Sequence, residues 1–417
     1  MKRVSPILLA VVLGLCLGSV LGGFAFLMFE PSATDLITQK YLSLRYRVAE
    51  YLPHPDEPEF VPTPLVAATV VATTTPTFTP AATAVAPART GTATRAPSPT
   101  RTPSVPVDVL PVAPSVALTG VKHDYQRWNN CGPTTLEMDL SFFGRSDTQA
   151  QIAAFLKPNP DDRNVRPDEM AAYVSKTPLH SIVRIDGTVE RLKALLSNNL
   201  PVIVETALVK QPQGWMGHYR LLVGYNAQTF NTMDSYDGPN VRISFSDFDG
   251  DWQAFNRLYI VVYPAAEEGR VRAILGEDVD DASMYTQAVQ VAQAESAANP
   301  RDAFAQFNLG MSLNGLKRYA EAAAAFDRAR TIGLPWRMMW YQFGAYVAYL
   351  HSGRQTEVIA LADAMLHGAD DLEESHYYKG LALQALGRVP EARREFQAAV
   401  GYNKNYVAAQ QALAQLK

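Results

Sequence analysis

Residues 125–135 read YQRWNNCGPTT and contain one of only two cysteines in this chain of 417 residues. Cys131 is followed by Gly132 and Pro133, and an apolar pattern begins at Leu136. Because proline is favoured in the first turn of a helix, Cys131 is predicted to lie at a helix N-terminus. The helix dipole and the free N–H groups there favour a thiolate, so the residue is predicted to be reactive. The simpler alternative is a small buried hydrophobic residue.

A thiolate nucleophile needs a base, and the base needs an orienting group. His218 opens a strongly apolar strand in GWMGHYRLLVGYN, and Asp234 follows in TMDSYDGP on what should be the neighbouring hairpin strand. A carboxylate there can accept the imidazole N–H and fix its tautomer. Gln126 precedes Cys131 by five residues and carries an amide able to donate to an oxyanion. These four residue types together indicate acyl transfer by a cysteine.

The elements expected to position these residues fall into two groups. Helices are expected first, at 132–143, 147–156, 166–176 and 189–198. Strands are expected next, within PVIVETAL, HYRLLVGYN, FNTMDSY and RLYIVVYP. Helices followed by a mostly antiparallel sheet indicate an α+β domain, which we place at residues 116–266.

The order Gln, Cys, His, Asp on such a domain is similar to that of the papain-like cysteine peptidases. The motifs Q-x4-CGPTT, GHYRLLVGYN and MDSYDGP more closely resemble the bacteriocin-processing (double-glycine leader) peptidases. Within that family, the resemblance is greatest to the stand-alone, C39-like branch. The resemblance implies that Gln126 forms the oxyanion hole, Cys131 attacks, and His218 and Asp234 complete a triad. The family usually has Asp-Pro where this chain has Asp-Ser, so Asp237 remains a second candidate for the orienting acid.

The N-terminal residues 1–32 are predicted to form a transmembrane signal anchor. No charged residue occurs from Val4 to Phe29, a stretch long enough to span a bilayer. Lys2 and Arg3 precede it, so the N-terminus is expected in the cytoplasm and the remaining domains outside, on a single-pass protein of the cell membrane. A cleaved signal peptide is the alternative.

Residues 33–115 are predicted to be a juxtamembrane segment, with a short helix at 33–52, and a disordered linker. Thr, Pro and Ala dominate the linker, and no acidic residue occurs between Phe60 and Val107. Such a mixture buries too little apolar surface to offset the entropy of ordering the chain.

Residues 280–417 are predicted to be helical with an internal period. Gly310 and Gly344 are 34 residues apart, and Gly380 follows after 36. This pattern resembles tetratricopeptide repeats, whose period is 34 residues. The small residues are expected where paired helices approach closely, which makes an all-α solenoid. A plain helical bundle is the alternative.

Composition excludes several function classes. The net charge of −4 provides no basic excess for nucleic acid. Cys16 lies in the apolar N-terminal run, so no disulfide with Cys131 is expected. The histidines lack ligand-like spacing, so no metal or cofactor is predicted. The segment DFDGDW, residues 247–252, resembles the start of a calcium loop but lacks its closing Glu, and we interpret it as a solvated loop.

Together these features predict a membrane-anchored, extracytoplasmic cysteine peptidase-like protein that hydrolyses a peptide amide bond. The repeats are expected to bind a peptide or protein partner, because their surfaces are concave. The competing hypothesis is a catalytically inactive scaffold in an envelope complex. Cleavage of amides in cell-wall peptides is a third possibility. The sequence leaves the substrate, the cleavage specificity and the oligomeric state open.

Overall fold

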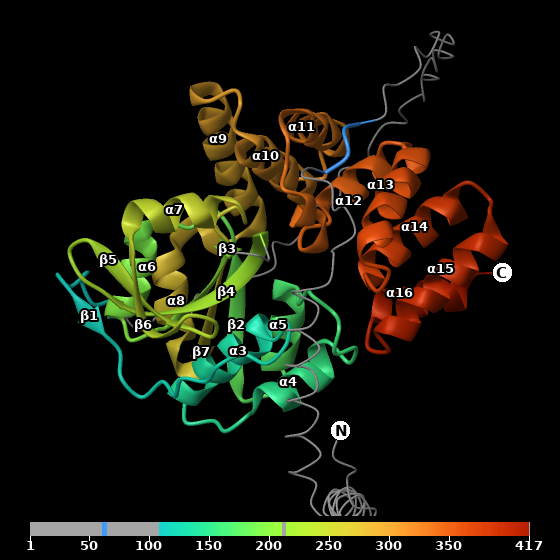
Figure 1. Ribbon diagram of the computed structural model, residues 1–417. Coiled ribbons are helices and arrows are strands. Elements are labelled where there is room, and N and C mark those ends of the chain that lie inside the picture. The colour runs from blue at the N-terminus through green and yellow to red at the C-terminus, as the bar shows by residue number, and fades with distance from the viewer. Residues whose placement is uncertain (1–60, 65–107, 211–213, 417) are drawn as a thin grey trace, which may run out of the picture.

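The computed structural model describes residues 61–64, 108–210 and 214–416 (Figure 1). They form an α+β part, here called the sheet domain (residues 108–279), followed by an arc of helices, here called the solenoid (residues 281–415). The predicted anchor and juxtamembrane helix lie outside the described residues. Within these residues no helix is long and apolar enough to cross a membrane.

One seven-stranded sheet organises the sheet domain. Its strand order is β2-β7-β3-β4-β5-β6, and β1 also pairs with β4. Each neighbouring pair is antiparallel. The strands are β1 (Val116–Ala117), β2 (Leu179–Arg184), β3 (Val202–Lys210), β4 (Gly214–Tyr225), β5 (Thr229–Asp234), β6 (Gly238–Ser244) and β7 (Tyr259–Pro264).

Helices cover both faces of the sheet. Because successive side chains of a strand point to opposite faces, Ile203 packs against α3, α4 and α5 while Val202 and Val204 pack against α6, α7 and α8. The two faces therefore carry two separate apolar cores. The helices are α3 (Cys131–Phe142), α4 (Gln149–Leu156), α5 (Pro167–Val174), α6 (Val189–Ser197), α7 (Phe245–Gln253) and α8 (Glu268–Leu275).

The interpretation of residues 247–252 as a solvated loop is wrong, because they belong to α7. The Ser244 side chain accepts the Asp247 N–H at 3.1 Å and caps the helix. Phe248 and Trp252, one turn apart, are fully buried against the sheet. The aspartates that suggest a calcium loop are thus the polar face of an amphipathic helix.

The solenoid is built from paired helices of tetratricopeptide type. Its helices are α9 (Asp281–Ala298), α10 (Ala303–Gly315), α11 (Tyr319–Ile332), α12 (Gly344–His351), α13 (Gln355–Gly368), α14 (Glu373–Ala385), α15 (Val389–Tyr402) and α16 (Val407–Gln415). The repeat glycines lie at close helix approaches, as predicted from the sequence. A Cβ at Gly310 would lie 2.8 Å from the Phe326 ring, and one at Gly380 would lie 2.6 Å from the Phe396 ring.

The first helix of each repeat, or the turn beside it, contacts the sheet domain. Trp215 of β4 stacks on Phe255 and on Phe304 of α10, with ring centroids 5.9 and 6.5 Å away. At the other end of the arc, Arg166 and Glu374 of α14 form an ion pair at 3.1 Å. The sheet domain therefore contacts the solenoid both near its first helices and near its last helices.

Residues 108–115, placed by the sequence at the end of the disordered linker, pack against the rest of the sheet domain. The Leu110 N–H donates to Asn198 Oδ1 at 2.8 Å, and the Ala113 carbonyl accepts the Tyr225 hydroxyl at 2.6 Å. The preceding residues, 65–107, lie outside the described part, so their disorder stays a prediction.

Candidate active site

Cys131 is the first residue of α3. Asn129 adopts a left-handed φ of 52° immediately before it, which turns the chain into the helix. A Cβ on Gly132 would lie 3.2 Å from Val165 Cβ and 3.4 Å from the Tyr219 ring. Glycine therefore allows the start of α3 to approach the sheet, and the partly buried thiol interacts with His218 and the Tyr219 backbone of β4.

Gln149, at the start of α4, holds the loop before the cysteine. Its Oε1 accepts the Arg127 N–H at 2.9 Å and the Thr134 hydroxyl at 3.1 Å. Its Nε2 donates to Asp124 Oδ2 at 2.7 Å and to the Tyr125 carbonyl at 3.0 Å. One buried amide thus fixes the path of the chain from 124 to 134.

His218 lies on β4 and is 2% exposed. Its Nε2 is 2.9 Å from Asp234 Oδ1. The Cys131 thiol also hydrogen-bonds to the His218 side chain. Because Nε2 is bonded to Asp234, Nδ1 is the imidazole nitrogen left for this bond. The imidazole therefore bridges the cysteine and the carboxylate, which is the arrangement expected from the three motifs.

Asp234 ends β5 and is fully buried. Its Oδ1 also accepts the N–H groups of Tyr236 at 2.8 Å and Asp237 at 3.0 Å, and its Oδ2 accepts Arg220 Nε at 3.0 Å. The Asp237 carboxylate instead pairs with Lys210 at 2.7 Å. Of the two aspartates left open by the sequence, Asp234 is the one in contact with His218.

Gln126 is brought to the same place by the residue after Asp234. The Gln126 N–H donates to the Ser235 carbonyl at 2.8 Å, and the Ser235 hydroxyl donates to Gln126 Oε1 at 2.9 Å. Because Oε1 is occupied, the amide presents its Nε2 as the remaining donor group.

The electrostatics of the site favour a charged pair. Burial raises the pKa of the Cys131 thiol, but its hydrogen bond to His218 and the charge of that imidazole outweigh burial and lower it. Burial lowers the pKa of His218, but Asp234 outweighs it and raises the pKa to about 9. Burial would likewise raise the pKa of Asp234, yet His218 and Arg220 hold it well below its usual range. Both shifts favour the charged thiolate–imidazolium pair over the neutral pair.

Two positioning residues, Arg220 and Ser235, escaped the sequence analysis. Arg220 lies two residues after His218, so the alternation of β4 directs both toward Asp234, and this spacing was a usable signal. The change from Asp-Pro to Asp-Ser is visible in the sequence, but only the folded chain shows that Ser235 lies beside Gln126. Its departure from the family's Asp-Pro pattern here supplies a hydrogen-bond donor.

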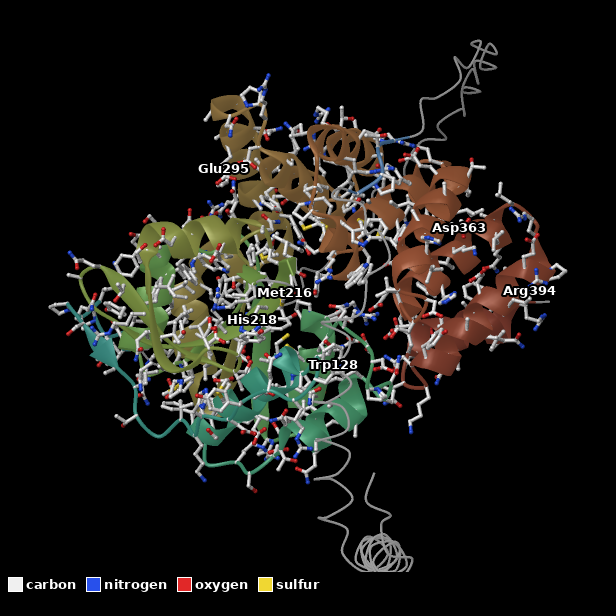
Figure 2. All side chains as sticks on the ribbon, viewed as in Figure 1. Trp128, Met216, His218, Glu295, Asp363 and Arg394 are labelled. Atoms are coloured by element: carbon white, nitrogen blue, oxygen red, sulfur yellow. The ribbon has the colours of Figure 1, made fainter. Side chains whose placement is uncertain are left out.

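The solenoid also reaches the site. The Tyr341 hydroxyl hydrogen-bonds to the backbone of Gly217, the neighbour of His218, and Trp215 packs edge-on against the Tyr341 ring at 6.0 Å. Figure 2 shows Met216 and His218 on β4, with Trp128 from the loop before α3 on the side toward the solenoid. Among the described residues no cluster of three or more His, Cys, Asp or Glu is arranged to hold a metal ion.

Comparison with known proteins finds a family that is similar to part of the sheet domain. Residues 118–260 match the Peptidase_C39 like family. No curated protein sequence matches the chain.

Each of three solved structures is similar to about a third of this chain. A putative C39-like peptidase from Bacillus anthracis has 16% identity, with 36% of this chain and 96% of that chain covered and a TM-score of 0.30. The peptidase domain of Streptococcus ComA has 16% identity, with 35% and 99% covered and a TM-score of 0.29. MamA from Desulfovibrio magneticus RS-1 has 17% identity, with 33% and 84% covered and a TM-score of 0.27.

The sequence match covers all four predicted site residues and the strands that hold His218 and Asp234. The resemblance predicted from the motifs is therefore confirmed for this part of the chain. Residues 118–260 are similar to the Peptidase_C39 like family, and a tetratricopeptide-like helical region follows them.

Proposed function

We propose that this protein is a cysteine peptidase that hydrolyses a peptide amide bond. The observation that carries the proposal is the bridge of His218 between the Cys131 thiol and Asp234 Oδ1. A thiol at a helix N-terminus, paired with a buried imidazole that a carboxylate orients, has the parts needed for nucleophilic acyl transfer.

In the proposed mechanism the Cys131 sulfur attacks the scissile carbonyl carbon. The oxyanion formed accepts hydrogen bonds from the Cys131 N–H and from Gln126 Nε2. Protonated His218 gives its proton to the leaving amine, and the C–N bond breaks to leave a thioester. His218 then takes a proton from water, the hydroxide attacks the thioester, and the acid product leaves with the thiolate restored.

We further propose that the protein is attached to the cell membrane by residues 1–32 with both domains outside the cytoplasm. The uncharged stretch from Val4 to Phe29, preceded by Lys2 and Arg3, supports this topology. A peptide or protein partner of the repeats is also proposed, on the grounds that stacked helix pairs offer extended binding surfaces.

The test of the peptidase proposal uses a short peptidyl acyloxymethyl ketone, which alkylates catalytic thiolates. The full chain is expected to form one adduct, on Cys131, detected by mass spectrometry. His218→Ala is expected to slow its formation about 100-fold or more, because general acid–base catalysis contributes that much. Ser175→Ala, an exposed residue at the end of α5, is the matched control and should react like the parent.

The competing proposal is an inactive scaffold, and the contact of Tyr341 with Gly217 favours it because a solenoid residue then covers the neighbour of His218. In that case the parent and His218→Ala would react with the peptidyl ketone at the same slow rate. Equal rates would therefore count against the peptidase and for the scaffold.

A further inference from the structure

A short segment of the predicted linker is docked on the solenoid. Residues 61–64, with the sequence Val-Pro-Thr-Pro, are drawn in blue beside α11 and α13 in Figure 1. The Val61 N–H donates to the Leu334 carbonyl at 2.9 Å, and the Pro62 carbonyl accepts Arg330 Nε at 2.8 Å. The Val61 side chain is 1% exposed and belongs to the apolar cluster of the solenoid.

The receiving residues form a built site, here called the Arg330 site and defined by Arg330, Leu334, Tyr349 and Glu357. Arg330 lies in the last turn of α11 and is 3% exposed. Its Nη1 donates to Glu357 Oε1 of α13 at 2.7 Å and to the Tyr349 hydroxyl of α12 at 2.8 Å. These bonds fix the orientation of the guanidinium, so the Arg330 side chain loses little additional freedom when its Nε donates to a carbonyl of the ligand.

The segment itself suits such a site. Its two prolines hold φ near −65° and favour an extended conformation before binding, so little entropy is lost when the segment docks. Val61 provides the side chain that enters the apolar cluster, and Pro62, which has no N–H, exposes only a carbonyl to Arg330. The recognised chemistry is an apolar residue followed by proline in an extended chain.

We propose that the Arg330 site is a binding site for an extended apolar-Pro peptide and that residues 61–64 are its ligand within this chain. The site is formed by α11 and α13, the second helices of two repeats, together with Leu334 after α11 and Tyr349 of α12. The described chain thus contacts the solenoid at residues 61–64 and the rest of the sheet domain from residue 108 onward.

A tethered ligand has an effective concentration of about millimolar, so a site of modest affinity is filled in the intact chain. The test measures binding of a fluorescent peptide with the sequence of residues 57–66, EPEFVPTPLV, to the full chain and to full-chain Val61→Asp. The aspartate places a charge in the apolar cluster and should release the segment. Val61→Asp is expected to bind the peptide saturably, whereas the parent should bind it at least 10-fold more weakly.

The matched control is the same peptide with its own Val61→Asp change, which should bind at least 10-fold more weakly than EPEFVPTPLV. Equal binding of both peptides, equal binding by both chains, or no binding to a folded Val61→Asp chain would overturn the proposal. If Val61→Asp fails to fold, hydrogen exchange of the parent decides. Slow exchange of the Val61 N–H supports docking, and exchange at the rate of a free peptide contradicts it.

Discussion

Asp234 is the residue on which most contacts of the candidate site converge. It bonds His218 through Oδ1 and Arg220 through Oδ2, while two backbone N–H groups of the following turn donate to Oδ1. A carboxylate with this many donors is held in its charged form and in one orientation. The orientation of the imidazole, and through it the state of the Cys131 thiol, therefore depends on Asp234.

The first prediction concerns Ser235, whose hydroxyl orients the Gln126 amide. Ser235→Ala should slow acylation by a peptidyl substrate about 10-fold, less than the 10²–10³ lost when an oxyanion donor itself is removed. Alkylation of Cys131 by iodoacetamide should not change, because no oxyanion forms in that reaction. A general loss of structure would instead alter both rates, and Ser175→Ala should alter neither.

The second prediction concerns stability against pH, measured in the Cys131→Ala background so that the thiol does not titrate. In the folded parent chain, burial lowers the pKa of His218, but the opposing interactions, chiefly those with Asp234, outweigh burial and raise the pKa from 6.5 to about 9. Without Cys131 the pKa of His218 loses part of this rise but is still raised by Asp234. The contribution of the charged pair is fully present below pH 6.5 and is lost as the pH rises through the folded pKa of His218. The stability gap between this background and the same chain with Asp234→Asn should therefore narrow as the pH rises above 6.5, as followed by urea unfolding.

The Asp237→Asn change provides the control for this pH series. Asp237 contacts Lys210 and not His218, so its stability gap should stay constant over the same range. A gap that narrows equally for both aspartates would contradict the assignment of Asp234 as the orienting acid.

At the scale of elements, local patterns predicted most of the framework. The helix after Cys131 and strands β3, β4, β5 and β7 appear within a few residues of where proline position and alternating apolar residues place them. β2 and β6 were missed, because their side chains are mostly half-buried or exposed and show no clear alternation. α7 was missed because its three aspartates resemble a calcium loop, although Phe248 and Trp252 have the spacing of one buried helix face.

The third prediction tests the repeat packing with two glycines of the solenoid. A Cβ at Gly380 would clash with Phe396 at 2.6 Å, whereas a Cβ at Gly401 meets nothing within 4 Å. Gly380→Ala should lower the free energy of unfolding by about 1–3 kcal/mol through overpacking. Gly401→Ala should leave it unchanged or raise it by up to about 1 kcal/mol. Similar losses for both, in urea titrations, would contradict the tetratricopeptide packing.

At the scale of the whole molecule, the solenoid packs directly against the sheet domain. The aromatic stack of Trp215, Phe255 and Phe304 joins β4 to α10, and Asn308 donates to the Gln253 carbonyl at 2.8 Å beside it. The sequence predicted the two domains but not this contact, because long-range pairing of aromatic residues leaves no local pattern. The same holds for Val61, which composition alone assigns to the linker.

The fourth prediction follows from this contact between the two parts. Phe304→Ala should lower the free energy of unfolding by about 2 kcal/mol. The temperature at which helicity is lost and the temperature at which a thiol reagent labels Cys131 should fall together. Val407→Ala, at a side chain 58% exposed, is the control and should shift neither. Loss of helicity while Cys131 stays protected would show that the two parts unfold independently.

The central claim is that Cys131 and His218 form a thiolate–imidazolium pair, and a pH series of iodoacetamide labelling tests it most directly. In the full chain, alkylation of Cys131 should persist well below the free-cysteine pKa of about 8.5, because the charged imidazole and the helix N-terminus favour the thiolate. His218→Ala should move the profile to higher pH, and Asp237→Asn should leave it in place. A parent profile centred near 8.5 and unmoved by His218→Ala would contradict the account.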